Sequence, residues 1–136
     1  MNAANVRQAV PFLWVHDIRR SLAFYVDGLG FALSNEWLDN GQLRWCRLEL
    51  GGAAIMLQEF WTEGRHRNVI SGEVGLGVAI YFICTDVVLL WHELTSRGLA
   101  ATSPIVGNGF WVTELHDPDG YQLFFESPAD AARDDG

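Results

Sequence analysis

The order of predicted secondary structure repeats along this chain, and the repeat constrains the fold more than any single motif. Residues 9–60 and residues 77–128 each follow the pattern of one strand, one helix and three strands. One such unit covers only one face of its sheet with a helix, so the other face needs a partner. We therefore expect a single α+β domain over residues 1–136, in which two βαβββ modules pair into a curved half-barrel cleft.

The first module opens with an apolar run rich in strand-forming residues at 9–15, followed by Asp17, a good helix N-cap. Apolar residues then recur at helical spacing until Gly28 and Gly30, which end the predicted helix. Asn40-Gly41 is a strong two-residue hairpin signal, and Gly51-Gly52 marks a second turn. These turns separate three predicted strands, at 31–38, 42–50 and 53–60.

The second module repeats this order with different residues. It has a predicted strand at 78–84, a helix that begins after Asp86 and ends at Gly98, and a short strand that starts near Leu99. The tight turn Asp117–Gly120 joins the last two predicted strands, 110–116 and 121–127. Between the modules, residues 61–76 lack periodicity and are expected to form a linker. The polar residues 129–136 are expected to be a frayed tail.

Composition excludes several classes of function. Apolar residues make up 49% of the 136 residues and charged residues only 19%, so a packed core is expected rather than disorder. The net charge of −8 repels phosphate backbones and argues against nucleic-acid binding. No apolar run is long enough for a membrane span, and the first residues do not read as a signal peptide. Cys46 and Cys84 lie in apolar runs and are expected to be free thiols of a cytoplasmic protein.

Three segments, in the predicted order, resemble one known superfamily. Residues 10–31 resemble the strand, Asp cap and "FY…LGF" helix that open vicinal-oxygen-chelate proteins, the glyoxalase/bleomycin-resistance/dioxygenase superfamily. Residues 80–98 resemble the opening of the second module in that superfamily, and residues 107–126 resemble its closing hairpin with an Asp-Pro-Asp-Gly turn. The resemblance implies the duplicated fold and a homodimer. It leaves function open, since members include metal-dependent isomerases, lyases and dioxygenases as well as antibiotic-binding proteins that use no metal.

The resemblance also implies where a metal would bind, because metal-using members place one inward His, Gln or Glu on each of four strands. Carried over onto this sequence, these positions fall on Val10, Met56, Ala79 or Ile80, and Phe124. Hydrocarbon side chains and one thioether do not supply the three or four nitrogen and oxygen donors that such a metal needs. We therefore predict no metal and no cofactor.

A displaced metal site stays open as an alternative. Gln58 shares the strand phase of Met56, and Glu126 shares that of Phe124, so a shifted site would use these two side chains and no histidine. The histidines lie at positions typical of surface or capping residues. His116 is the exception that stays open, because it ends a strand and a strand end can face the mouth of a cleft. The other three are His16, His66 and His92.

The strand phase that faces the expected cleft is rich in aromatic residues, and the chain contains six Trp. Phe110 and Trp111 are neighbours, so only one of them is expected to face inward. A buried Glu126 would pair with a ligand cation or act as a general base, and it is the only catalytic candidate. The predicted ligand-binding residues are Phe12, Trp14, Trp45, Arg47, Met56, Gln58, Phe110, Trp111, Phe124 and Glu126.

Three hypotheses follow from these residues. The first is a binding protein that sequesters a small, partly aromatic or cationic molecule without a metal, in the manner of the drug-sequestering members. The second is a metal-dependent lyase, isomerase or dioxygenase of the same superfamily with displaced ligands. The third is a degenerate domain in which the same aromatic residues simply fill the cleft as core. Whether the protein is an enzyme is left open by the sequence.

Overall fold

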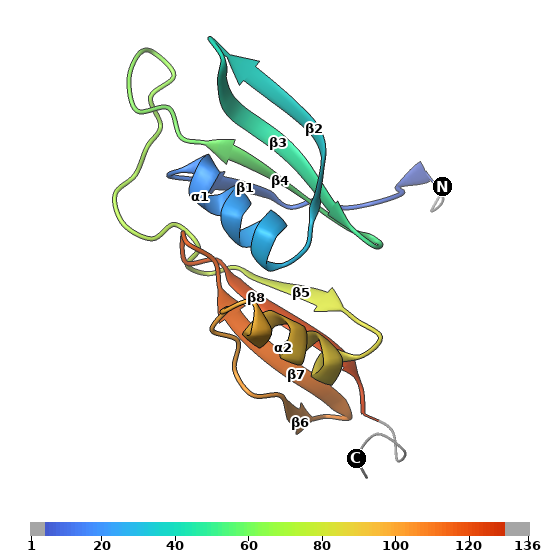
Figure 1. Ribbon diagram of the computed structural model, residues 1–136. Coiled ribbons are helices and arrows are strands. Elements are labelled where there is room, and N and C mark those ends of the chain that lie inside the picture. Colours follow the sequence, from blue (N-terminus) through green and yellow to red (C-terminus); the bar gives the residue numbers. More distant parts are fainter. Residues whose placement is uncertain (1–4, 130–136) are drawn as a thin grey trace. The chain divides into compact units, whose positions relative to one another are not determined.

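The computed structural model describes residues 5–129, so the predicted tail lies almost entirely outside the described residues. The chain forms two compact units, each with one four-stranded sheet (Figure 1). Unit 1 contains the described residues up to Ile18 together with Phe31–Val69, and unit 2 contains Arg19–Gly30 together with the described residues from Ile70 onward. The units therefore divide the chain differently from the sequence modules, because the segment Arg19–Gly30 groups with unit 2.

The sheet of unit 1 has the strand order β1-β4-β3-β2. β1 (Phe12–Val15) pairs in parallel with β4 (Ala53–Glu59), whereas β3 (Gln42–Leu50) pairs antiparallel with both β4 and β2 (Ala32–Asp39). The predicted Asn40-Gly41 hairpin joins β2 to β3. Both of its residues have positive φ, 51° and 79°, as a two-residue hairpin of this kind requires.

The sheet of unit 2 has the corresponding order β5-β8-β7-β6. Its parallel pair joins β5 (Ala79–Ile83) to β8 (Gln122–Pro128), and its antiparallel pairs join β7 (Phe110–His116) to β8 and to β6 (Ile105–Gly107). The two sheets thus share one topology, which matches the predicted repeat.

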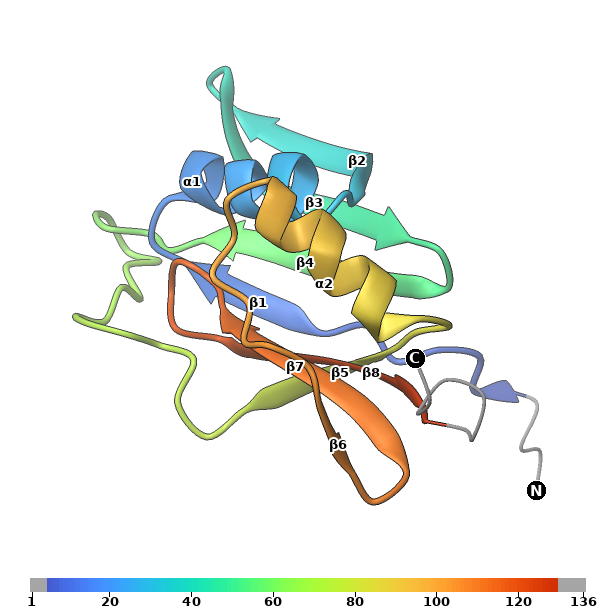
Figure 2. The same ribbon diagram turned by 60° about the horizontal axis from the view of Figure 1, so that its bottom comes forward.

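Helix α2 (Val87–Ser96) covers one face of the second sheet (Figure 2). As predicted, Asp86 caps it, because its carboxylate accepts a hydrogen bond of 3.0 Å from the Leu89 backbone N–H. The first turn is tied to β8, since the Val87 N–H donates to the Ser127 hydroxyl over 2.9 Å. The side chains of β8 that share a phase with Ser127 therefore face the helix, and Leu123 and Phe125 are buried there.

The helix predicted after Asp17 differs from a regular α-helix. The chain forms one α-helical turn, α1 (Ile18–Leu22), and then a π-helix, η2 (Ala23–Gly28). Tyr25 lies in η2 and is fully buried. The segment ends near the predicted glycines, with Gly30 at a φ of +95°.

One predicted strand was wrong. A strand was expected to start near Leu99, but β6 begins only at Ile105, immediately after Pro104. Proline has no N–H to donate to a neighbouring strand, so regular pairing with β7 starts beyond it. Upstream, Thr102 holds the chain near β7, because its N–H donates to the Glu114 carbonyl over 2.9 Å and its hydroxyl accepts from the Glu114 N–H over 3.0 Å.

The predicted α+β class with two modules is confirmed by these two open, four-stranded sheets. Enclosure of a cleft by both modules stays a prediction. Within residues 5–129, no helix is long and apolar enough to cross a membrane.

Candidate functional site

Six of the predicted ligand-binding residues lie on one face of the sheet of unit 1. The strand register aligns them in two rows: Phe12, Met56 and Arg47 lie opposite one another, as do Trp14, Gln58 and Trp45. Their neighbours of the other phase, such as Leu13 and Leu57, are buried on the opposite face. We call this surface the first open face; it consists of Phe12, Trp14, Trp45, Arg47, Met56 and Gln58.

Two aromatic rings of the first open face form a connected ladder with Phe60. The centroids of Phe12 and Trp14 are 5.4 Å apart with tilted planes, and Trp14 stacks on Phe60 at 5.6 Å. Phe60 is buried, whereas Phe12 is 43% exposed. The ladder therefore runs from an anchored ring to an accessible one, an arrangement that presents flat apolar area to a ligand.

The charge on the first open face is already paired. The Arg47 Nε donates to the Glu49 carboxylate over 2.9 Å, and its Nη2 donates to the Gln8 side chain over 3.4 Å. The hydrogen bond from Arg47 lowers the pKa of Glu49 below its ordinary value. The guanidinium is thus held in place and neutralised within unit 1.

Two further tryptophans of unit 1 were missed by the sequence reasoning. The Arg44 guanidinium lies 3.9 Å from the centroid of Trp61, and its Nη1 donates to the Glu59 carboxylate over 2.9 Å. Trp37 approaches Trp61 edge-on at 6.4 Å. The register would have revealed Trp37, because it lies opposite Trp45 in the β2–β3 pair. Trp61 lies in a segment without periodicity, so no sequence signal pointed to it.

The sheet of unit 2 has an open face of its own, on the side away from α2. The register gives three rows there: Ile83, Glu126 and Val112; Tyr81, Phe124 and Glu114; and Ala79, Gln122 and His116. Tyr81 stacks on Phe124 with centroids 4.6 Å apart and planes 11° apart. We call this surface the second open face; it consists of the nine residues of these rows.

The structure separates the neighbours Phe110 and Trp111. Phe110 shares its phase with Glu114 and is 37% exposed, so it extends the second open face. Trp111 lies opposite Ser127 and therefore faces α2. Its buried indole Nε1 has no hydrogen-bond partner among residues 5–129. Only Phe110 of the pair is available to a ligand on the open side.

The carboxylates of the second open face have few partners. Glu114 accepts a hydrogen bond of 2.6 Å from the Gln122 side-chain amide and lies 3.9 Å from His116 Nε2. Glu126 is half-buried, and across the described part of the chain its carboxylate takes no hydrogen bond and no ion pair. Its charge acts on Cys84, where burial first and Glu126 second raise the pKa of the thiol. Tyr81 and Glu114 were absent from the predicted site.

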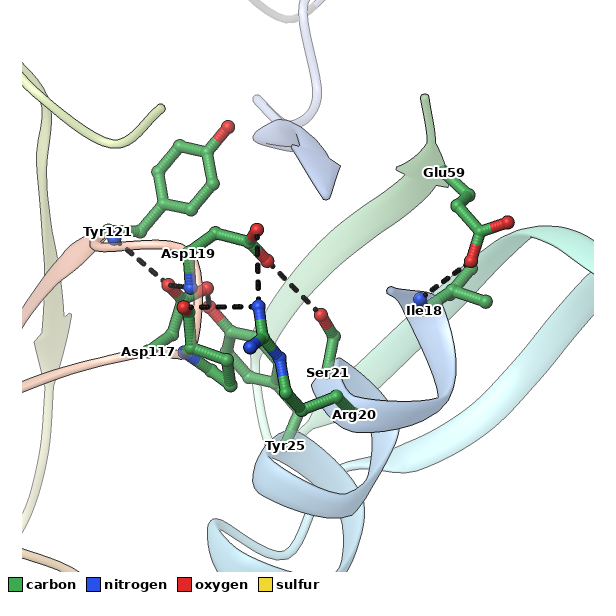
Figure 3. A network of polar contacts seen from close by, with 9 residues as sticks. Ile18, Arg20, Ser21, Tyr25, Glu59, Asp117, Asp119 and Tyr121 are labelled. Carbon is green, nitrogen blue, oxygen red and sulfur yellow. Dashed lines mark hydrogen bonds and ion pairs between the residues drawn. The ribbon is translucent and has the colours of Figure 1, made fainter. Parts of the chain in front are cut away.

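A third cluster of polar residues surrounds the turn between β7 and β8 (Figure 3). Tyr25 donates to the Asp117 carboxylate over 2.7 Å, and Ser21 donates to Asp119 over 3.4 Å. Burial raises the pKa of both Tyr25 and Asp117. Because these groups are buried and bonded to one another, the cluster fixes the segment Arg19–Gly30 to the turn and offers nothing to a ligand.

A protein-family model describes the same architecture. The model of the glyoxalase/bleomycin resistance protein/dioxygenase superfamily matches residues 7–125. The chain belongs to this superfamily. No curated protein matches the chain.

Solved structures share the fold at low identity. TnmS3, an antibiotic-binding protein from Streptomyces sp. CB03234, is 21% identical with a TM-score of 0.63, covering 89% of this chain and 96% of its own. TioX from Micromonospora sp. ML1 is 21% identical with a TM-score of 0.67, covering 91% of this chain and 98% of its own. A glyoxalase/bleomycin resistance protein/dioxygenase domain from Frankia sp. EAN1pec is 18% identical with a TM-score of 0.71, covering 90% of this chain and 98% of its own.

The metal that many superfamily members use does not fit the residues of this chain. At the corresponding positions, Met56 lies opposite Phe12, and Phe124 is stacked against Tyr81, so carbon atoms and one thioether occupy the places where donors would be needed. Ala79 shares the open side with Phe124, and Val10 precedes β1. Between residues 5 and 129, no group of three or more His, Cys, Asp or Glu residues is placed to hold a metal ion.

Proposed function

We propose that this protein binds a small, partly aromatic or cationic molecule without a metal ion, as a drug-sequestering member of its superfamily. The observation that carries the proposal is the first open face, where the strand register brings Phe12, Trp14 and Trp45 together with Met56. Flat rings on a rigid sheet bind flat ligands at low conformational cost. Antibiotic binding by TnmS3, which shares the fold, supports the same class of ligand.

The alternative of a metal-dependent enzyme gains no support from a group of three or more His, Cys, Asp or Glu residues within residues 5–129. Gln58, which a displaced site would need, is buried on the first open face and donates to the Glu59 carbonyl over 3.4 Å. Glu126 lies on the second sheet. Neither side chain has a histidine beside it in its cross-strand row.

Calorimetric titration tests the proposal on the first open face. The probes are 1-naphthalenemethanol, a neutral flat molecule, and a panel of glycopeptide and aromatic antibiotics, all screened first by thermal shift. Trp14→Ala and Trp45→Ala should each weaken the binding of any ligand found by about tenfold, because each removes a large apolar contact. Trp91→Ala is the control, since Trp91 lies on α2 and its indole bonds the Ala101 carbonyl.

Two outcomes would overturn the proposed function. One is the absence of a thermal shift with every probe at millimolar concentration. The other is a stoichiometric divalent metal in protein purified without chelator, lost on Glu126→Ala, which would restore the enzyme hypothesis.

A cytoplasmic homodimer remains part of the proposal. Both cysteines are free thiols, as expected in a reducing compartment. Light scattering coupled to size exclusion should give twice the monomer mass of 15.2 kDa. A monomer at micromolar concentration would remove the dimer from the proposal without affecting ligand binding.

A further inference from the structure

The second open face combines two stacked rings with acidic side chains that have no Lys or Arg partner among residues 5–129. Tyr81 is 53% exposed and stacks on Phe124, so one ring of the pair is accessible. Glu114 lies opposite Phe124 in the same cross-strand row, and Glu126 lies two residues along β8 on the same side. The aromatic pair is therefore bordered by carboxylates on two sides.

The carboxylates of this face are not neutralised by a Lys or Arg of the same face. The amide of Gln122 orients Glu114 through a bond of 2.6 Å, and an amide carries no charge to compensate it. His116 lies 3.9 Å from Glu114 and is a cation only when protonated. Among the rows of this face no Lys or Arg occurs, and Glu126 is half-buried without an ion pair in residues 5–129.

A half-buried carboxylate without a partner is unfavourable, because burial removes part of its hydration. A ligand that brings a positive charge would supply the missing partner, and the neighbouring rings add attraction between their faces and that charge. A negatively charged ligand would be repelled, and a neutral one would leave Glu126 as it is. The arrangement thus selects by charge as well as by shape.

We infer that the second open face is an ammonium-binding subsite, in which Glu126 and Glu114 pair with the amine of an aromatic amine while its ring lies on Tyr81. The inference rests on the proposed function, because it takes the open faces as ligand surfaces. It narrows the ligand to an aromatic cation and adds Tyr81 and Glu114 to the residues that determine specificity.

Three naphthalene probes that share one ring system and differ in charge separate the contribution of the ligand's charge from that of its ring. Calorimetry compares 1-naphthylmethylamine, 1-naphthalenemethanol and 1-naphthoate on the wild-type protein. The amine should bind about tenfold more tightly than the alcohol, as expected for a hydrogen bond to a charged group, and the carboxylate should bind most weakly. Equal affinity of amine and alcohol would overturn the inference.

Two variants assign the charge preference to this face. Glu126→Gln keeps the shape of the side chain and should weaken amine binding about tenfold while leaving alcohol binding unchanged. Tyr81→Leu should weaken amine binding, whereas Tyr81→Phe should keep it. Glu63→Gln, in the exposed segment after β4, is the matched control for loss of one carboxylate. Thermal melts confirm that each variant is folded.

The results distinguish failure of the inference from failure of the proposed function. Alcohol binding that is weakened by Trp45→Ala, without any preference for the amine, would keep the proposed function and reject the ammonium subsite. Amine binding that survives Glu126→Gln unchanged would also reject it. If no naphthalene probe binds, the inference is rejected, and the proposed function is then decided by the antibiotic panel alone.

Discussion

The two sheets share one topology but differ in how their charged side chains are paired. On the sheet of unit 1, Arg47 is paired with Glu49 and Arg44 with Glu59, both at 2.9 Å. On the second open face, Glu126 has no ion pair in the described residues, and Glu114 is held by an amide. The two faces therefore differ in charge rather than in rings: the first has an arginine that is already paired, and the second has carboxylates without a Lys or Arg partner among residues 5–129.

The largest loss of stability is expected when the mostly buried ion pair between Arg44 and Glu59 in unit 1 is broken. Arg44→Ala removes a guanidinium whose side chain is 10% exposed, and leaves the Glu59 carboxylate and the Phe60 carbonyl without this donor. Breaking such a pair from one side costs about 3 kcal/mol of unfolding free energy. Urea unfolding measures it, with Arg65→Ala in the exposed loop as control.

The double variant Arg44→Ala/Glu59→Gln sharpens this result. It should recover part of the lost stability, because it removes the uncompensated charge and keeps a side-chain oxygen to accept from the Ile18 N–H, as Glu59 does over 2.9 Å. If Arg44→Ala is no more destabilising than Arg65→Ala, charge pairing does not distinguish unit 1 from unit 2, and the comparison fails.

A smaller loss is expected from the buried polar cluster of unit 2. Tyr25→Phe removes the hydroxyl that donates to Asp117 over 2.7 Å in a buried setting, and should cost about 2 kcal/mol. Tyr81→Phe is the matched control on the second open face, where the loss should be no more than about 0.5 kcal/mol. Equal losses in urea unfolding would mean that the two tyrosines do not differ in their environments.

Much of this architecture was accessible from the sequence, because it depends on short-range rules. The alternation of Phe12 with Leu13 and of Phe124 with Phe125 predicted which side chains share a face, and the sheet register agrees. The Asn40-Gly41 dipeptide predicted the hairpin because both positions need positive φ. These features are local, so a single sequence contains them.

What the sequence could not supply are contacts that join distant residues. Arg44 and Trp61 are separated by 17 positions and meet only because β4 returns beside β3. The π-helical winding of η2 accompanies a bond between Tyr25 and Asp117, far away along the chain. Even the absence of an ionic partner for Glu126, as far as residues 5–129 are concerned, is a property of the folded neighbourhood. The charge contrast between the two faces was therefore invisible beforehand.

The two hairpins test how closely the modules repeat one another. Asn40 and Asn108 have φ of 51° and 53°, each followed by a glycine with positive φ. Asn→Ala at either position should cost about 1 kcal/mol, because alanine adopts the left-handed region less readily. Gly52→Ala, where an added Cβ meets open space, should leave urea unfolding nearly unchanged. A cost at only one of the two Asn positions would show that the hairpins are not equivalent.

The smallest effect is a change in thiol titration, and it reports directly on the charge of the second open face. Burial and then the Glu126 carboxylate raise the pKa of Cys84, since a nearby negative charge disfavours the thiolate. Glu126→Gln removes that charge and leaves the burial, so the pKa of Cys84 should fall towards its ordinary value. More thiolate is then present at a given mildly alkaline pH, and alkylation by iodoacetamide should be faster.

Cys46 provides the internal control for this measurement, because it is fully buried and its pKa is raised to about 11, mainly by burial. Mass spectrometry of the two cysteine peptides separates their rates, and only the Cys84 rate should respond to the variant. The sign follows from the removal of a negative charge alone, so it holds whether or not a ligand is known. An unchanged Cys84 profile would mean that the Glu126 carboxylate exerts no field at this face, and the contrast between a neutralised first face and a charged second face would lose its physical basis.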